Sequence, residues 1–299
     1  MTTARSTRTR VDTSVSAFGR LGDTPQRDYS RKLRLFNVLA EPELRAAIAS
    51  LRLTPGMRVL DAGCGTGECV GWLAAAVAPT GLAVGVDLST SHLASARVAL
   101  ESRALLVQAD VQRAPLHAAS FDLVWSVNTV NHLRHAQTAV GALAALLRPG
   151  GRIALGQSSF LPDMFFAWDA RLERVTTEAV RAYYRDRYQL TEQDLASVRG
   201  LVGLMLEAGL TQVTARTCVI ERTAPLDPCT QAWLLETVFR GTWGERLRPY
   251  LSPPDYAHLS RLCDPEHPEF ALRRADFHFL QTFTLVVGAC GASAAGGSG

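Results

Sequence analysis

The chain has 299 residues, 47% of them hydrophobic, and a formal net charge of +3, which suits one large domain or two small ones with a substantial core. We expect no membrane insertion, because no apolar run approaches the roughly 18 residues of a spanning helix, and no secretory signal, because no apolar segment follows the basic N-terminus. The positive charge is spread along the chain, which argues against a nucleic-acid partner.

The N-terminal part of the chain divides near residue 26. Residues 1–26 lack apolar periodicity and hold few large apolar residues, which predicts a disordered tail. Over residues 27–53, apolar residues recur at helical spacing, with an interruption at Glu41-Pro42. This pattern predicts two helices that precede the first strand and cap the domain.

Between residues 57 and 156, apolar strand patterns alternate with helix patterns. The expected strands are 57–61, 82–87, 104–108, 121–127 and 152–156. The expected helices between them are 68–78, 90–102 and 136–147. Such alternation predicts a parallel sheet with helices on both faces, in which ligands bind beyond the carboxyl ends of the strands.

The alternation breaks after residue 157. Two segments of helical pattern that are rich in aromatic residues, 158–190 and 227–274, follow the fifth and sixth strands. Plain helix packing would account for most of these aromatic residues. Because the segments emerge beside the expected ligand edge, we nevertheless expect them to form a helical lid over an apolar or aromatic substrate.

The last part of the chain completes the sheet. We expect a regular helix at 191–208, a sixth strand at 212–222 and a long antiparallel strand at 276–287. Residues 291–299 are expected to be a flexible tail. The predicted fold, over residues 27–290, is α/β: a Rossmann-like, doubly wound, mostly parallel seven-stranded sheet with helical lid insertions after strands five and six.

The segment from Val59 to Gly67 carries the clearest functional signal. An apolar strand ends in Asp61, and Gly63, Gly65 and Gly67 follow before a helix begins. Glycines permit positive φ angles and a close approach of the backbone to a ligand. The spacing is tighter than a dinucleotide fingerprint, and no phosphate-binding Gly-Lys-Ser/Thr follows. A carboxylate at the strand tip suits a cationic ligand; a glycine turn without a ligand is the alternative.

Polar residues also follow the next strands. Asp87 lies twenty residues after Gly67, where its carboxylate can accept hydrogen bonds from ribose hydroxyls. The alternative is that Asp87 caps the following helix in competition with Ser89. Asp110 and Asn128 follow the third and fourth strands, so all of these side chains should meet at one edge of the sheet.

The segment from Leu60 to Gly67, LDAGCGTG, resembles the first motif of the class I S-adenosylmethionine-dependent methyltransferases. The chain is most similar to their small-molecule group, of the ubiquinone/menaquinone-biosynthesis type. The resemblance implies S-adenosylmethionine as the cofactor. The cofactor-binding residues that it implies are Asp61, Gly63, Cys64, Gly65, Gly67, Asp87, Leu88, Asp110, Val111 and Asn128.

The resemblance also implies which part of the cofactor each of these residues binds. Asp61 and the glycines would hold the methionine half, and Asp87 the ribose. Asp110 would meet the adenine amino group while Val111 packs on the ring, and Asn128 would line the methyl end.

Two histidines are candidate bases. Methyl transfer is an in-line displacement in which positioning in a dry site supplies most of the rate, and a base helps when a hydroxyl or amine attacks. Asn131-His132-Leu133 resembles a His-His-Leu segment of the family, although Asn replaces its first His. The alternative for His132 is that it caps a helix or lines the pocket without proton transfer. His278, on the last strand, is the second candidate. The histidines expected at the surface are His92, His117, His258 and His267.

The sequence therefore predicts methyl transfer to oxygen, nitrogen or carbon of a small molecule, in secondary metabolism or quinone modification. Three alternatives are a same-fold enzyme that uses the cofactor for cyclisation or elimination, a non-catalytic metabolite-binding protein, and an NAD-dependent dehydrogenase. The six cysteines show no metal-binding spacing, so we expect no metal, reduced thiols and a cytoplasmic location. A homodimer is left open.

Overall fold

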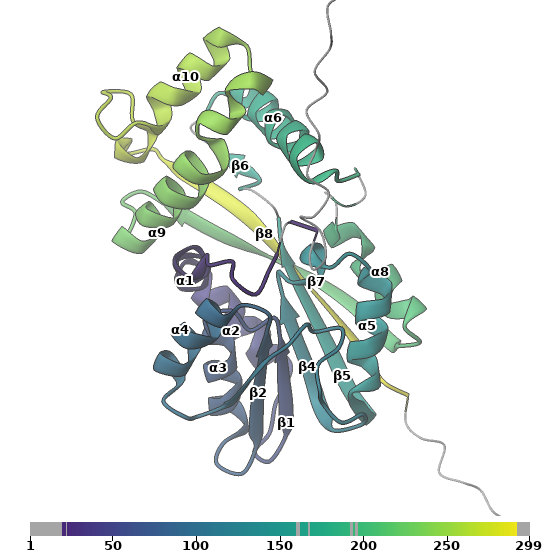
Figure 1. The fold of residues 1–299 in the computed structure, drawn as a ribbon. Helices are drawn as coiled ribbons and strands as arrows, with labels where there is room; N and C mark the ends of the chain where they lie inside the picture. Colours follow the sequence, from purple (N-terminus) through teal and green to yellow (C-terminus); the bar gives the residue numbers. More distant parts are fainter. Residues whose placement is uncertain are drawn as a thin grey trace, which may run out of the picture.

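The computed structural model describes residues 20–21, 23–159, 162–166, 168–191, 194 and 197–291. A twisted, mostly parallel sheet forms its centre, and a helical lobe covers one end of it (Figure 1). The strands are β1 (Arg58–Ala62), β2 (Leu82–Asp87), β3 (Leu105–Gln108), β4 (Phe121–Val127), β5 (Leu147–Ser158), β6 (Met164–Phe165), β7 (Thr211–Thr223) and β8 (His278–Ala289).

The strand order is β3-β2-β1-β4-β5-β8-β6, and β7 pairs with β8. Strands β1 to β5 are parallel, whereas β8 runs antiparallel to β5, β6 and β7. The predicted Rossmann-like α/β fold is confirmed. The described sheet has eight strands rather than seven, because the short strand β6 pairs Met164 with Leu280 and Phe165 with Phe279.

Helices cover both faces of the sheet. The helices beside the sheet and at its edge are α1 (Ser30–Leu39), α2 (Glu41–Ser50), α3 (Glu68–Val77), α4 (Thr90–Leu100), η2 (Val130–His132), α5 (Ala136–Ala145) and α8 (Ser197–Glu207). The lobe contains α6 (Ala170–Tyr188), α9 (Pro228–Trp233), η3 (Leu234–Trp243), η4 (Glu245–Tyr250), α10 (Pro253–Cys263) and η5 (Ala271–Arg273). Figure 1 shows α3 and α4 on one side of the sheet and α5 and α8 on the other. Within the described part of the chain, no helix is both long enough and apolar enough to traverse a bilayer.

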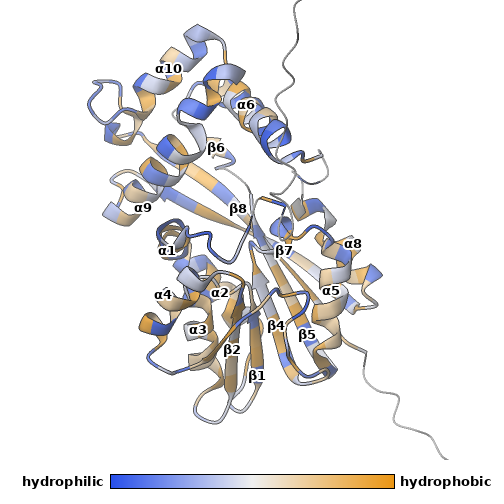
Figure 2. Ribbon diagram, viewed as in Figure 1, coloured by the Kyte–Doolittle hydropathy of each residue, from blue (hydrophilic) through white to orange (hydrophobic). Residues whose placement is uncertain are grey.

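The central strands are apolar on both sides, as parallel strands covered by helices should be. Figure 2 shows β1, β2, β4 and β5 as largely hydrophobic. Val59 and Trp125 belong to the core on the α3 side, while Leu60 and Val124 belong to the core on the α5 side. Successive residues of each strand thus face opposite helix layers, so apolar side chains bury both faces of the sheet. Polar residues lie instead at the carboxyl ends of the strands.

The lobe is built around aromatic packing. The ring centroids of Phe165 and Trp243 lie 5.4 Å apart, and those of Phe239 and Trp243 also lie 5.4 Å apart. Most of these residues therefore serve helix packing. The helical pattern expected from residue 158 is wrong at its start: β5 extends to Ser158, and α6 begins only after Asp169, whose carboxylate caps it.

The segment before α1 corrects the predicted N-terminal tail. Residues 1–19 lie outside the described residues, but the tail was expected to extend to residue 26. The backbone N–H of Arg20 donates to the carbonyl of His132 over 2.7 Å, and that of Thr90 donates to Pro25 over 3.0 Å. These contacts hold the segment against η2 and α4. The predicted C-terminal tail lies outside the described residues beyond Gly291.

Candidate functional site

A cavity opens at the carboxyl ends of β1, β2 and β4. It encloses about 1020 Å³, including space open to solvent. We call it the strand-end cavity. Of the predicted cofactor-binding residues, those that line it are Asp61, Gly63, Cys64, Gly65, Asp87, Leu88, Asp110, Val111 and Asn128. The structure therefore brings together all of the predicted set except Gly67.

The glycines divide into two uses. Gly63 has φ of +86°, and a Cβ there would lie 2.1 Å from the hydroxyl oxygen of Thr129, so the close contact with the cavity wall requires glycine. Gly67 is the N-cap of α3 with φ of +91°, and a Cβ there would lie 2.9 Å from the Cβ of Ala96 on α4. Gly67 lies outside the cavity lining and allows α3 and α4 to pack closely, and its contact with the cofactor stays a prediction.

Asp61 is the most unusual group in the cavity. Its side chain is buried at 3% exposure, and its Oδ2 atom has no hydrogen-bond partner in the described structure. Burial, together with the negative charges of Asp87 and Glu68, raises its pKa well above the ordinary value. An unpaired buried carboxyl oxygen beside two other acids is costly unless a ligand supplies a donor and a positive charge.

The charge of the whole cavity lining also favours a positively charged ligand. The acidic residues that line the strand-end cavity are Asp23, Asp61, Asp87 and Asp110. Among the described residues in its wall there is no lysine or arginine. The cavity therefore suits a cation with hydrogen-bond donors, and S-adenosylmethionine, which carries a sulfonium and an ammonium group, fits that description.

Asp87 is held in place at the tip of β2. Its Oδ2 accepts from the backbone N–H of Gly65 over 2.8 Å, and its Oδ1 accepts from that of Ser89 over 2.9 Å. The cap of α4 is Ser89, whose hydroxyl accepts from the backbone N–H of His92, so the alternative that Asp87 caps this helix is wrong. The carboxylate keeps lone pairs for a ligand.

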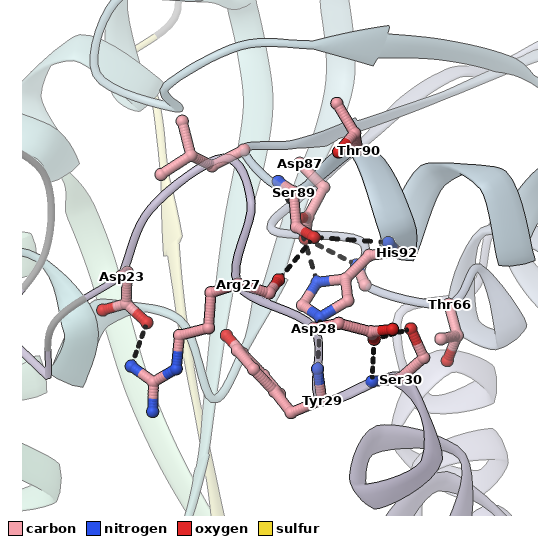
Figure 3. Close-up of polar contacts among 12 residues, drawn as sticks. Asp23, Arg27, Asp28, Tyr29, Ser30, Thr66, Asp87, Ser89, Thr90 and His92 are labelled. Atoms are coloured by element: carbon pink, nitrogen blue, oxygen red, sulfur yellow. Dashed lines mark hydrogen bonds and ion pairs between the residues drawn. The ribbon is translucent and has the colours of Figure 1, made fainter.

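His92 was expected at the surface, and this expectation is wrong. Its side chain is only 2% exposed, and its Nδ1 lies 3.2 Å from Asp87 Oδ1 (Figure 3). Its Nε2 accepts from the backbone N–H of Tyr29 over 3.4 Å, which assigns the ring hydrogen to Nδ1. The sequence could have indicated this position, because His92 lies three residues after Ser89, the N-cap residue of the helix. A side chain at that position reaches back over the first turn of the helix.

Residues 20–21 and 23–29 form a strap across this edge of the sheet. The Ser89 hydroxyl donates to the carbonyl of Arg27 over 2.8 Å (Figure 3). The Tyr29 ring lies edge-on to His92, with centroids 4.4 Å apart, and stacks on His132 at 6.5 Å. Tyr29 therefore closes the cavity between α4 and η2.

The strap also supplies the partner of His132. The Nδ1 atom of His132 lies 3.1 Å from each carboxylate oxygen of Asp23. A carboxylate only accepts, so Nδ1 carries the hydrogen and Nε2 is left as an acceptor. Burial raises the pKa of Asp23, but the hydrogen bond to His132 and the electrostatic influence of His132 and Arg27 outweigh burial and leave that pKa below its ordinary value. Sequence reasoning missed Asp23 because it lies in the apparent tail.

His278 does not lie at this site. Its Nε2 is 2.6 Å from Glu221 Oε1, its ring stacks on Phe166 at 4.0 Å, and it lines a separate cavity in the lobe beside Trp168. The second candidate base is therefore wrong: His278 is the first residue of β8 and pairs with Thr223 of β7, where the sheet meets the lobe.

The remaining predicted residues support the cavity walls. Asp110 accepts from the backbone N–H of Gln112 over 2.9 Å, and Val111 is buried beside it. Asn128 has φ of +52° and accepts from the backbone N–H of Ser158 over 2.8 Å. This bond ties the end of β4 to the end of β5.

A second cavity, the lobe cavity, meets the first. The residues that line both are Tyr29, Leu33, Phe36, Asn128 and His132. Its other walls come from β5, β8, α6, α9 and η3, and they include Gln157, Gln281, Tyr184 and Trp233. Among the described residues of this lining there is no acid, whereas Arg27 and Lys32 are present. His132 stands where the two cavities join.

Residues 60–155 match a family model described as a methyltransferase domain. This part of the chain is therefore similar to methyltransferase domains. The match covers β1 to β5 and so includes every predicted cofactor-binding residue. Residues outside it build the strap and the lobe.

Curated relatives of the chain are methyltransferases of several kinds. It is 39% identical over 137 residues to malonyl-[acyl-carrier protein] O-methyltransferase of Enterobacter lignolyticus, matching 45% of this chain and 53% of the relative. It is 34% identical over 132 residues to the ubiquinone/menaquinone biosynthesis C-methyltransferase UbiE of Syntrophotalea carbinolica, with 43% and 55% covered. It is 32% identical over 118 residues to 27-O-demethylrifamycin SV methyltransferase of Amycolatopsis mediterranei, with 38% and 43% covered. The chain thus spans about half the length of these relatives.

Solved structures share the fold. The YcgJ protein of Bacillus subtilis matches with a TM-score of 0.54 at 16% identity, over 84% of this chain and 99% of that one. Phosphoethanolamine N-methyltransferase 2 of Haemonchus contortus, solved with S-adenosylhomocysteine, matches with a TM-score of 0.51 at 17% identity, over 88% of this chain and 58% of that one. At these identities the likeness concerns the fold alone.

Proposed function

We propose that the protein transfers a methyl group from S-adenosylmethionine to a small organic molecule. One observation carries the proposal: the buried, unpaired Oδ2 atom of Asp61 lies in an acid-lined cavity at the strand ends of a methyltransferase fold. That oxygen would accept from a cationic ligand, and the adjoining lobe cavity offers room for an acceptor.

The residues of the strand-end cavity would each bind the part of the cofactor that the family resemblance implies. Asp61 would face the ammonium end, Asp87 would accept from the ribose hydroxyls, and Asp110 with Val111 would hold the adenine. When bound, S-adenosylmethionine would supply the electrophilic methyl group. Asn128 and His132, which line both cavities, would then border the place of transfer.

We propose His132 as the base, with Asp23 as its positioning residue. The carboxylate would hold the Nδ1 hydrogen, so that Nε2 takes the proton of an attacking hydroxyl or amine. Tyr29, stacked on the imidazole, would exclude water from that side. This role of His132 applies when the methyl group is transferred to an oxygen or a nitrogen atom. It does not describe methylation of a carbon atom.

The acceptor is proposed to be apolar or aromatic, with the lobe acting as its lid. The aromatic side chains in the lobe-cavity wall support this, as do relatives named for a rifamycin and for quinone biosynthesis. We therefore retain secondary metabolism or quinone modification as the setting. All six cysteines are unpaired, which supports the proposed cytoplasmic location.

Isothermal titration calorimetry with S-adenosylmethionine and S-adenosylhomocysteine tests the proposal. Wild-type protein should bind both, and Asp87→Ala should weaken both by about tenfold or more, because buried ligand hydroxyls lose their acceptor. Release of S-adenosylhomocysteine in the presence of an acceptor would separate methyl transfer from cyclisation or from passive binding. Wild-type protein that binds neither compound would refute the proposal.

A further inference from the structure

We propose that the lobe cavity selects a neutral or anionic aromatic acceptor that donates hydroxyl hydrogens to two buried glutamines. These are Gln157 at the end of β5 and Gln281 in β8. The inference rests on the proposed methyl transfer and specifies the acceptor class of that same site.

Both glutamines are buried and incompletely paired. Gln157 is 5% exposed and Gln281 is 2% exposed, and both line the lobe cavity. In the described structure, the Oε1 atom of each is buried without a hydrogen-bond partner. The Oδ1 atom of Asn131, in the same lining, is also buried and unpaired. Buried amide oxygens in folded proteins are nearly always satisfied, so several in one cavity wall, those of the two glutamines among them, indicate that a ligand supplies missing donors.

The amide orientations are fixed by the backbone. The Nε2 of Gln157 donates to the carbonyl of Ser158 over 3.3 Å, and the Nε2 of Gln281 donates to the carbonyl of Ser159 over 2.6 Å. Turning either amide over would set its oxygen against a carbonyl oxygen, and neither can donate. One hydrogen of each nitrogen is therefore committed to a carbonyl, and each amide oxygen is left as an unpaired acceptor.

The charge and shape of the wall narrow the ligand further. Phe36 and Trp233 line the cavity and favour a flat apolar ring. Arg27 and Lys32 are present, and no described residue of the lining is acidic, so a cationic acceptor would find no counter-charge. A hydroxylated aromatic ring suits the aromatic side chains of the wall, the two amide acceptors and the absence of acids together.

Calorimetry with three matched probes tests this inference, with and without S-adenosylhomocysteine. The probes are 2,3-dihydroxynaphthalene, 2,3-dimethoxynaphthalene, which has no donors, and 2-(aminomethyl)naphthalene, which is cationic. We expect the diol to bind at least about tenfold more tightly than either of the others, because only the diol pairs both oxygens without adding positive charge. No binding of the diol, equal binding of diol and dimethoxy probes, or tighter binding of the cation would overturn the inference.

Variants show whether the glutamines carry the preference. Gln157→Leu and Gln281→Leu should each weaken diol binding by about tenfold and leave the dimethoxy probe unaffected. Gln231→Leu is the matched control, because that amide also donates to a backbone carbonyl, at 2.8 Å, but lies outside the lobe-cavity wall. Unchanged diol binding by both cavity variants would overturn the inference.

The affinity for S-adenosylhomocysteine separates the two proposals. A variant that retains this affinity is folded and keeps its strand-end cavity. Wild-type protein that fails to bind S-adenosylhomocysteine contradicts the proposed function, whereas wild-type protein that binds it but shows no diol preference contradicts only the acceptor class.

Discussion

The strand-end cavity and the lobe cavity share five residues but differ in charge. Four acids and no described lysine or arginine line the first, while Arg27 and Lys32 and no described acid line the second. The acids follow the ends of parallel strands or come from the strap, whereas the bases come from the strap and α1. The site can thus hold a cation on one side of His132 and a neutral or anionic molecule on the other.

The two cavities also differ in how they leave polar groups unpaired. The unpaired groups in the strand-end cavity include an acid, Asp61, beside two further acids, so its missing partner should bring charge. In the lobe cavity the unpaired groups are the amide oxygens of Asn131, Gln157 and Gln281, so the missing partner needs only donors. The first arrangement should be far more sensitive to substitution, because leaving a charge uncompensated is costlier than leaving an amide unpaired.

The largest expected effect is therefore that of Asp61→Asn. Affinity for S-adenosylmethionine should fall by about a hundredfold or more, since the variant loses the charge that balances the ligand. Glu41→Gln, which removes an acid from the outer end of α2, is the control and should bind normally in calorimetry. Asp61→Asn binding within threefold of wild type would show that the acid cluster does not hold the cation.

The same variant should make the ligand-free protein more stable at high pH. The folded-state pKa of Asp61 lies above its unfolded value, so its contribution to stability is present at low pH and is lost as pH rises through the folded pKa. Above that pH, the free energy of unfolding of Asp61→Asn should exceed that of wild type by about 1 kcal/mol or more. Each kcal/mol should raise the melting temperature by roughly 2–4 °C. Melting curves at low and high pH measure the difference, and equal curves for both proteins would contradict it.

Substitutions at the junction should affect turnover rather than cofactor binding. His132→Ala should lower kcat by about a hundredfold or more with a hydroxyl acceptor, and Asp23→Asn by less, because the imidazole remains but its orientation and charge balance are disturbed. The pH profile of Asp23→Asn should shift, while affinity for S-adenosylhomocysteine stays near that of wild type. If His132→Ala retains full kcat, positioning alone accounts for the rate.

The fold was largely predictable because it rests on local patterns. The alternation of apolar strands and helices predicted β1 to β5, and the acids at Asp61, Asp87 and Asp110 predicted which edge binds the ligand. The pairing of Asp23 with His132 was not predictable, since the two residues are 109 positions apart and meet only after the chain folds. His278 was misassigned for the same reason, because the length of β8 decides what its first residue contacts.

The smallest expected effect concerns the charge of the lobe cavity. Lys32→Glu should weaken binding of the anionic probe 3-hydroxy-2-naphthoate by about two- to fivefold. The effect is small because the residue is exposed to solvent as a whole, and because burial of its ammonium group lowers the pKa of Lys32. The neutral diol should be unaffected, and the difference between the two probes should shrink at high ionic strength. Arg34→Glu, on the same helix but outside both cavity linings, is the matched control. If both variants lose the same affinity for the anionic probe, the anion responds to the net charge of the protein. The difference in charge between the two cavities would then depend only on the acids of the strand-end cavity.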